Sequence, residues 1–244
     1  MTNPLRIQQL MKLVDLTRLN DQDDAAGMQQ WLEQDLASAA VLPAAVCVYP
    51  QYLTQVKTFL KQHQAAVKLA TVVNFPSGAL PLAEVLGQIK AALAAGADEI
   101  DCVLPYQTLL LGHTEQVRAF LAAVRQATAG VCLKIIIESG ELVTCQQISK
   151  ATELVVESGA DFVKSSTGKV KVGVTEEAAR IMLAVIAASE RPVGFKASGG
   201  VRSVEFALKL VSLFEELTGE VATAQYMRLG ASALLKDLSQ QLDY

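Results

Sequence analysis

Residues 96–101 read GADEID, and residues 159–164 read GADFVK. In each segment a glycine can end a helix, two residues turn the chain, and a strand begins. The two segments therefore indicate one helix-to-strand corner that recurs along the chain.

Short β-rich runs follow one another at intervals of about 30 residues, the length of a βαβ unit, with alanine-rich helical segments between them. Proline suits the first position of a helix, so we expect a helix to begin at Pro81. Thr144, Thr175 and Ser203 are expected to be helix N-caps. The eight predicted strands are Lys12–Leu16, Ala44–Tyr49, Lys68–Phe75, Glu99–Leu104, Leu133–Glu138, Phe162–Ser166, Gly194–Ala197 and Met227–Leu229.

Strict alternation of strands and helices predicts a parallel sheet. Eight units in 244 residues favour an α/β fold closed into a (β/α)8 barrel, the TIM barrel, as a single domain over residues 1–244. The first segment, Leu5–Met11, is expected to be an extra helix that plugs the barrel floor.

The composition excludes several classes of protein. The net charge is −4 and no basic cluster occurs, which argues against a nucleic-acid partner. No signal peptide is recognisable, and no apolar run reaches the roughly 18 residues of a membrane span, so a cytoplasmic protein is expected. The four cysteines lack C-x-x-C spacing and are expected to be reduced thiols.

Lysine is unusual in a barrel strand, because such strands are buried on both faces and are mostly apolar. Three predicted strands nevertheless contain one, at Lys134, Lys164 and Lys196. One such lysine could equally face the surface or end its strand. Lys164 and Lys196, however, occupy corresponding positions on neighbouring strands, among residues where an unpaired cation would be costly. This convergence indicates a functional role.

Two converging lysines can provide a nucleophile. A free lysine has a pKa of about 10.4, and both burial and a nearby cation disfavour its charged form. A neutral lysine amine can attack a carbonyl group and form a Schiff base. We therefore interpret the pair as one nucleophile and one cation that lowers the pKa of its neighbour.

Two carboxylates belong to the same region. Asp101 follows Gly96 at the same offset at which Lys164 follows Gly159, so the two side chains should share one layer of the barrel. Asp101 is expected to relay protons through water. Asp15 points from the same rim, although a helix cap or turn residue is an equal alternative for it.

Glycine-rich segments after three strands predict a phosphate site. Gly199 and Gly200 follow the seventh strand, and Gly230-Ala231-Ser232 follows the eighth and opens a short helix at Ala233–Leu238. Barrels often bind phosphate with these loops and a helix N-terminus. Gly168-Lys169 can add a point charge after the sixth strand.

The sequence indicates neither metal nor cofactor chemistry. Its two histidines, His63 and His113, lie away from the predicted strand ends, so the ligand set of a zinc-dependent aldolase is missing. No G-x-G-x-x-G motif, which would indicate a nicotinamide-dinucleotide site, opens the first βα unit. We expect no metal and no cofactor.

These segments resemble the deoxyribose-phosphate aldolase family nearly from end to end. The matching stretches are VDLTRLN (14–20), AVCVYP (45–50), ATVVNFP (70–76), DEID (98–101), LKIIIE (133–138), DFVKSSTG (161–168) and GFKASGGVR (194–202). The last two are highly specific in combination.

The resemblance implies a class I aldolase that reversibly cleaves 2-deoxy-D-ribose 5-phosphate to D-glyceraldehyde 3-phosphate and acetaldehyde in deoxyribonucleotide catabolism. Its partners would be this phosphosugar and acetaldehyde, and it would be a homodimer or a monomer. By resemblance, Lys164 forms the Schiff base, and Asp101 and Lys196 form the proton-relay and pKa-tuning pair. Residues around the substrate hydroxyls match Asp15, Thr17, Cys47 and Lys134. Residues that contact the sugar and phosphate match Thr167, Gly168, Lys169, Gly199, Gly200 and Ser232.

Cys47 is expected to line the pocket as a bystander, since a buried strand thiol is common in a core.

The chain departs from the family pattern near the phosphate site. Relatives of the enterobacterial form carry a second serine where this chain has Ala233 after Ser232, which predicts weaker phosphate recognition. Some relatives use a C-terminal tyrosine in proton transfer. Tyr244 could do the same, with a mobile terminus as the alternative.

Three other functions stay open at this point. The chain could be a Schiff-base aldolase for other aldehydes, or a catalytically silent phosphate-binding barrel. It could also be a phosphosugar isomerase, for which Glu138 is the candidate base.

Overall fold

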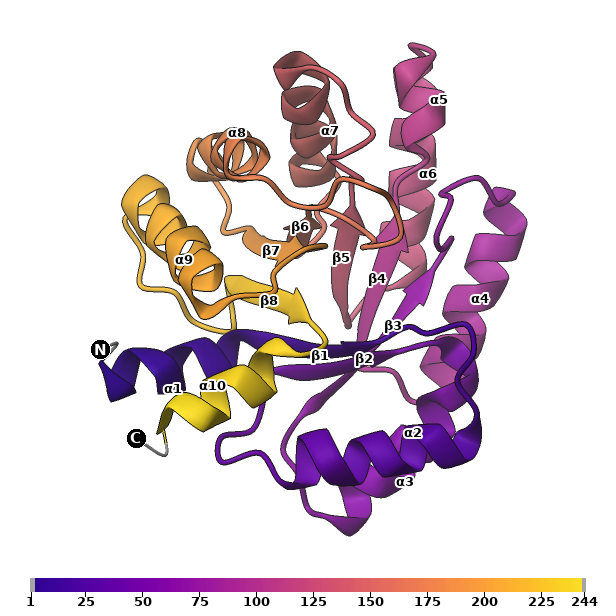
Figure 1. Ribbon diagram of the computed structural model, residues 1–244. Coiled ribbons are helices and arrows are strands. Elements are labelled where there is room, and N and C mark those ends of the chain that lie inside the picture. The colour runs from indigo at the N-terminus through magenta and orange to yellow at the C-terminus, as the bar shows by residue number, and fades with distance from the viewer. Residues whose placement is uncertain (1–2, 243–244) are drawn as a thin grey trace.

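The computed structural model describes residues 3–242, so Tyr244 lies outside the described residues. Eight parallel strands close into a barrel in chain order, with the last strand beside the first (Figure 1). The predicted (β/α)8 barrel is confirmed. The strands are β1 (Val14–Arg18), β2 (Ala45–Val48), β3 (Lys68–Val73), β4 (Glu99–Val103), β5 (Cys132–Ile136), β6 (Phe162–Lys164), β7 (Gly194–Ser198) and β8 (Met227–Ala231).

Helices surround the barrel, and their apolar faces pack on the strands to form the main hydrophobic core (Figure 1). A π-helical turn, Leu32–Ala37, continues α2, and a short 3-10 helix, Pro50–Tyr52, precedes α3. The α-helices are α1 (Pro4–Leu13), α2 (Ala25–Trp31), α3 (Leu53–Gln62), α4 (Leu82–Ala94), α5 (Tyr106–Leu110), α6 (Thr114–Ala127), α7 (Cys145–Glu157), α8 (Glu176–Ala187), α9 (Val204–Thr218) and α10 (Leu234–Leu242).

The predicted N-caps are confirmed. Thr144 and Gln147 form a capping box at α7, and the side chains of Thr175 and Ser203 accept backbone N–H groups at the starts of α8 and α9. Pro81 precedes α4 as its cap residue instead of occupying its first position. This difference of one residue does not change the path of the helix.

The N-terminal helix is present, but its predicted place was wrong. Its apolar side chains, which include Ile7 and Leu10, are buried, and α1 packs beside α10 and β8 in the outer layer instead of closing the barrel floor (Figure 1). Arg6 of α1 also forms an ion pair with Glu215 of α9. Since α1 continues through Lys12 to Leu13, β1 begins two residues later than predicted.

All four cysteines are free thiols. In residues 3–242, no helix has both the length and the apolar character that crossing a bilayer requires.

Candidate active site

Strand register brings the predicted charged residues together. Lys164 on β6 is the register partner of Lys196 on β7, and Asp101 on β4 is the partner of Lys134 on β5. All four side chains are buried. Side chains of alternate strands fill one layer of a barrel, so β4 and β6 can meet across its interior.

Asp101 is the centre of this cluster. One of its carboxylate oxygens, Oδ2, accepts hydrogen bonds from Lys164 Nζ and Lys196 Nζ, each at 2.8 Å. The other, Oδ1, accepts one from Lys134 Nζ at 2.9 Å. Burial acts to raise the pKa of Asp101, but the three lysines outweigh it and hold that pKa well below its usual range. Asp101 is therefore a carboxylate at neutral pH.

The two lysines on β6 and β7 differ in their surroundings. Burial lowers the pKa of Lys164. The Asp101 carboxylate acts to raise that pKa and the Lys196 ammonium acts to lower it, and the net result is a lowered pKa. Burial also acts to lower the pKa of Lys196, but Asp101 and Asp15 outweigh it and raise that pKa above the usual value. The arrangement therefore provides one lysine that releases its proton readily and one that stays charged.

Asp15 is fully buried, so the alternative of an ordinary cap or turn residue is wrong. Its Oδ1 accepts a hydrogen bond from Arg228 Nη1 at 2.6 Å. Its Oδ2 lies 2.5 Å from Lys196 Nζ, an ion pair whose angles fall outside those of a hydrogen bond. Lys196 is thus paired with two carboxylates, those of Asp15 and Asp101.

Two members of the cluster were missed in the sequence. Glu99 accepts a hydrogen bond from Lys134 Nζ at 2.5 Å, and Arg228 Nη2 donates to Glu99 at 3.0 Å. Arg228 lies between Met227 and Leu229 in a predicted strand, and Glu99 is the first residue of another. The argument applied to strand lysines, that a charge in a buried strand needs a reason, would have found them.

A cavity of about 580 Å³ opens above the cluster at the carboxyl ends of the strands. Lys164 lines it, whereas the other members of the cluster lie beneath it, and Cys47 is fully buried. In a barrel enzyme this end is where the βα loops form the active site. The other predicted residues that line the cavity are Thr17, Thr167, Gly168, Lys169, Gly199, Gly200 and Ser232.

The backbones of the loops after β6 and β7 approach each other closely. Gly199 and Gly200 adopt φ angles of +79° and +88°, which side chains other than glycine rarely adopt. A Cβ at Gly199 would lie 2.9 Å from Ser166 Oγ, and a Cβ at Gly173 would lie 2.1 Å from Gly199 O. The two loops touch through backbone atoms, which keeps their N–H groups near the cavity.

Glu138 holds the loop after β6. Its carboxylate accepts hydrogen bonds from Ser166 Oγ at 2.6 Å and from the Thr167 N–H at 3.1 Å. Glu138 is fully buried, has a left-handed backbone (φ +52°) and does not line the cavity. This position gives no support to its role as the base of an isomerase.

Lys169 lies at the cavity mouth. Its ammonium is 3.4 Å from Asp21 Oδ2 and 5.8 Å from the centre of the Tyr49 ring. Tyr49 also donates a hydrogen bond to Asp21 at 2.5 Å. The predicted point charge is therefore beside the cavity, paired with the exposed carboxylate of Asp21.

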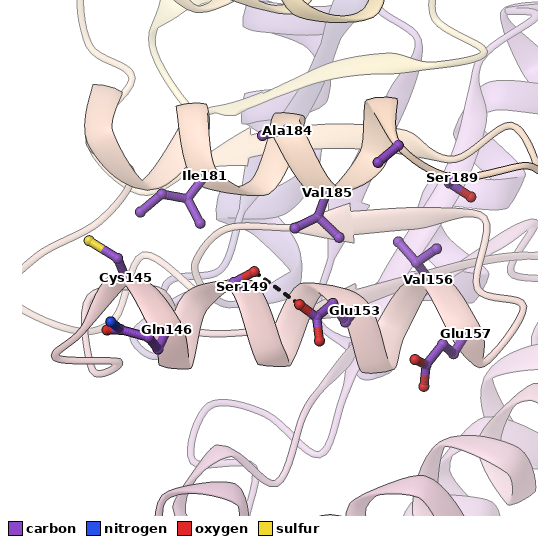
Figure 2. Close-up of a pocket in the computed structure, with 11 residues that line it drawn as sticks. Cys145, Gln146, Ser149, Glu153, Val156, Glu157, Ile181, Ala184, Val185 and Ser189 are labelled. Atoms are coloured by element: carbon purple, nitrogen blue, oxygen red, sulfur yellow. Dashed lines mark hydrogen bonds between the residues drawn. The ribbon is translucent and has the colours of Figure 1, made fainter.

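A second hollow, of about 690 Å³, lies outside the barrel between α7 and α8 (Figure 2). Aliphatic side chains, which include Ile181 and Val185 of α8 and Val156 of α7, line it together with polar residues (Figure 2). Ser149 donates a hydrogen bond to Glu153 within α7. The hollow has no convergent buried charges, so the candidate active site is the cavity above Lys164.

Both histidines lie at the ends of outer helices, His63 just after α3 and His113 just before α6. The His63 ring stacks on Phe59 at 4.0 Å. Over residues 3–242, no group of three or more His, Cys, Asp or Glu side chains is arranged to hold a metal ion.

The comparisons with known proteins agree with this architecture. A family model described as DeoC/LacD family aldolase matches residues 9–240. A protein from Coccidioides immitis, assigned as a deoxyribose-phosphate aldolase, is 28% identical, with 95% of this chain and 86% of that chain covered and a TM-score of 0.82. A deoxyribose phosphate aldolase from Aeropyrum pernix is 26% identical, with 96% and 92% covered and a TM-score of 0.77. A Toxoplasma gondii protein assigned in the same way shares the fold, with 21% identity, 98% and 96% covered and a TM-score of 0.89. Because the family model spans nearly the whole chain, the protein belongs to the DeoC/LacD family of aldolases.

Proposed function

We propose that the protein is a class I deoxyribose-phosphate aldolase, which cleaves 2-deoxy-D-ribose 5-phosphate reversibly through a Schiff base on Lys164 and serves deoxyribonucleotide catabolism in the cytoplasm. The observation that carries the proposal is a lysine with a lowered pKa that alone of the buried cluster lines the cavity. A scaffold that only binds phosphate has no need of such a lysine.

In the cleavage direction, the neutral amine of Lys164 attacks C1 of the open-chain sugar, and loss of water leaves a protonated imine. A base removes the proton of the C3 hydroxyl, and the electron pair of the C2–C3 bond moves toward the imine carbon. D-glyceraldehyde 3-phosphate leaves, and an enamine stays on Lys164. Protonation of the enamine and addition of water release acetaldehyde and restore the amine.

Asp101 and Lys196 suit the proton transfers of this sequence. The Asp101 carboxylate contacts both lysine Nζ atoms at 2.8 Å, so it can pass a proton between an ordered water molecule and the reacting nitrogen. The Lys196 ammonium keeps positive charge beside Lys164, which favours the neutral amine before attack. Neither step needs a metal or a cofactor.

The loops after β7 and β8 are suited to bind the phosphate group. Gly199 and Gly200 offer backbone N–H groups, and Ser232 and Ala233 lie just before the first turn of α10. A helix N-terminus favours negative charge through its free N–H groups. Lys169 can leave Asp21 for the phosphate, because an exposed ion pair of this kind is weak.

Reduction with borohydride in the presence of acetaldehyde tests the proposal. We expect an ethyl group on Lys164 in peptide mass mapping, and none on the Lys164→Met variant. A sample reduced without acetaldehyde is the control for adventitious modification. Failure to find the adduct, or its spread over exposed lysines, would instead favour a catalytically silent phosphate-binding barrel.

Substitution of Ala233 by serine tests the phosphate end. One added hydrogen bond contributes about 1 kcal/mol, so Ala233→Ser should lower the KM for 2-deoxy-D-ribose 5-phosphate about fivefold. The KM for unphosphorylated 2-deoxy-D-ribose should stay the same and serves as the control. An unchanged KM for the phosphorylated sugar would place the phosphate elsewhere in the cavity.

A further inference from the structure

Arg228 and Glu99 close the floor of the cluster without touching the cavity. The guanidinium of Arg228 donates to Asp15 at 2.6 Å and to Glu99 at 3.0 Å, and its Nε donates to the carbonyl of Ala224. Its Cζ lies over the Phe162 ring, 5.5 Å from the ring centre. Arg228 is therefore fixed on several sides, and it is only 6% exposed.

The buried charges of this cluster do not balance when every group is ionised. Its cations are Lys134, Lys164, Lys196 and Arg228, and its carboxylates are Asp15, Glu99 and Asp101. Four cations thus stand against three carboxylates, all of them buried. An uncompensated charge in a buried site is costly, and the group usually neutralises instead.

The geometry points to Lys164 as the group that gives up its proton. Lys134 contacts the carboxylates of Glu99 and Asp101, and Lys196 contacts those of Asp15 and Asp101. Arg228 cannot be deprotonated in a protein. Lys164 has the carboxylate of Asp101 alone, which it shares with the other two lysines.

We propose that Arg228 and Glu99 are positioning residues that set the charge state of Lys164 by fixing this balance of buried charge. Two chains of contacts connect them to it. One runs from Arg228 through Asp15 and Lys196 to Asp101, and the other from Glu99 through Lys134 to Asp101. The inference rests on the proposed function only where it treats Lys164 as the nucleophile. The effect on the titration of Lys164 does not depend on that function.

The two cysteine thiols close to the cluster do not change this count of charges at neutral pH. The groups that act on Lys164 directly are Asp101 on β4, Lys196 on β7 and Cys47 on β2. Burial raises the pKa of the Cys47 thiol, and it raises the pKa of Cys132, near Lys134 and Glu99, to about 12. Both thiols are therefore uncharged.

The balance of buried charge predicts that substitutions at the two members of the Arg228–Glu99 ion pair shift the titration midpoint of Lys164 in opposite directions. Arg228→Gln removes the excess cation, so Lys164 should keep its proton to a pH about one unit higher than in the wild type. Glu99→Gln removes a carboxylate and should lower the midpoint by about as much. The double variant restores an excess of one cation, and Arg228→Lys keeps the charge, so both should titrate close to the wild type.

The titration of Lys164 can be measured without turnover. Acetic anhydride acetylates only the neutral amine, and peptide mass mapping over a series of pH values gives the midpoint for Lys164 and, as an internal reference, for exposed Lys90. Circular dichroism shows whether each variant is folded. If Arg228→Gln does not fold, Glu99→Gln carries the test alone.

The proposal is supported if the two single variants move the midpoint in opposite directions and the double variant reverses both shifts. It is overturned if both move it the same way, if neither moves it, or if Glu99→Gln alone leaves it unchanged or raises it. If the two residues only supported the fold, their variants would lose activity, but the midpoint of Lys164 would not move in opposite directions. Because acetylation does not depend on imine formation, a failed borohydride test would remove the aldolase mechanism and leave this result standing.

Discussion

Replacement of Lys164 by methionine is expected to lower kcat/KM for 2-deoxy-D-ribose 5-phosphate on the order of 10⁵-fold, the loss typical of an enzyme without its nucleophile. The same variant should be at least as stable as the wild type. Methionine fills a similar volume and replaces a buried amine whose charged form has no carboxylate of its own, and ionisable groups in such clusters that are replaced by apolar ones often leave the stability unchanged or raise it. Steady-state kinetics and thermal unfolding check the two halves of this prediction.

Two further variants separate the amine from its charge. Lys164→Arg keeps a permanent cation but cannot supply a neutral amine, so it should be equally inactive and should unfold at a lower temperature. Lys90→Met removes an exposed lysine on α4 and should keep full activity. Residual turnover of several per cent in Lys164→Met would mean that another lysine, such as Lys196, forms the imine.

The fold could be predicted from the sequence because its signals are local. Each strand is a short and mainly apolar run, and several helices have a cap residue or a proline at their start, as at Thr144, Thr175 and Pro81. Closure follows from the number of units. The position of α1 could not be predicted, since packing beside α10 depends on a helix more than 200 residues away along the chain.

The candidate site was predicted where a residue breaks the pattern of its strand. Lys134, Lys164 and Lys196 are polar residues in apolar runs, and the structure brings them to one carboxylate. Arg228 breaks the pattern in the same way, and Glu99 is a charged residue at the start of its predicted strand. Glu99 lies two residues before Asp101, and residues two apart in a strand face the same side, so that signal was present.

Other features leave no local signal. Asp15 has the spacing of a cap residue. Its contact with Arg228, which lies near the other end of the chain, shows it to be part of the cluster. The clamp of Glu138 on Thr167 needs a left-handed backbone at Glu138, which glycine adopts readily and glutamate does not. The partner of Lys169, Asp21, comes from a loop at the other end of the chain.

Asp101→Asn is expected to affect stability and activity together, in contrast to Lys164→Met. Three buried lysine ammonium groups meet at this carboxylate, and the amide of asparagine would leave them without its charge and turn N–H groups toward at least one of them. Removal of one partner of a buried ion pair typically costs about 3–5 kcal/mol. Loss of proton transfer should also lower kcat by about 10²–10⁴-fold. Urea unfolding and kcat measurements check the two effects, with Asp98→Asn, in the turn before β4, as a matched control for the reaction.

The pH dependence of that stability difference gives a second check. The pKa of Asp101 in the folded protein lies well below its usual range, whereas in the unfolded chain it is about 3.9. A carboxylate with a lowered folded-state pKa stabilises the fold fully above its unfolded pKa, and the stabilisation is lost as the pH falls through the folded-state value. The difference in unfolding free energy between wild type and Asp101→Asn should therefore be constant from pH 7 to about pH 5 and narrow only in stronger acid. A difference that already shrinks between pH 7 and 5 would mean that Asp101 takes up a proton in the native state, and that the three lysines are not held by a carboxylate.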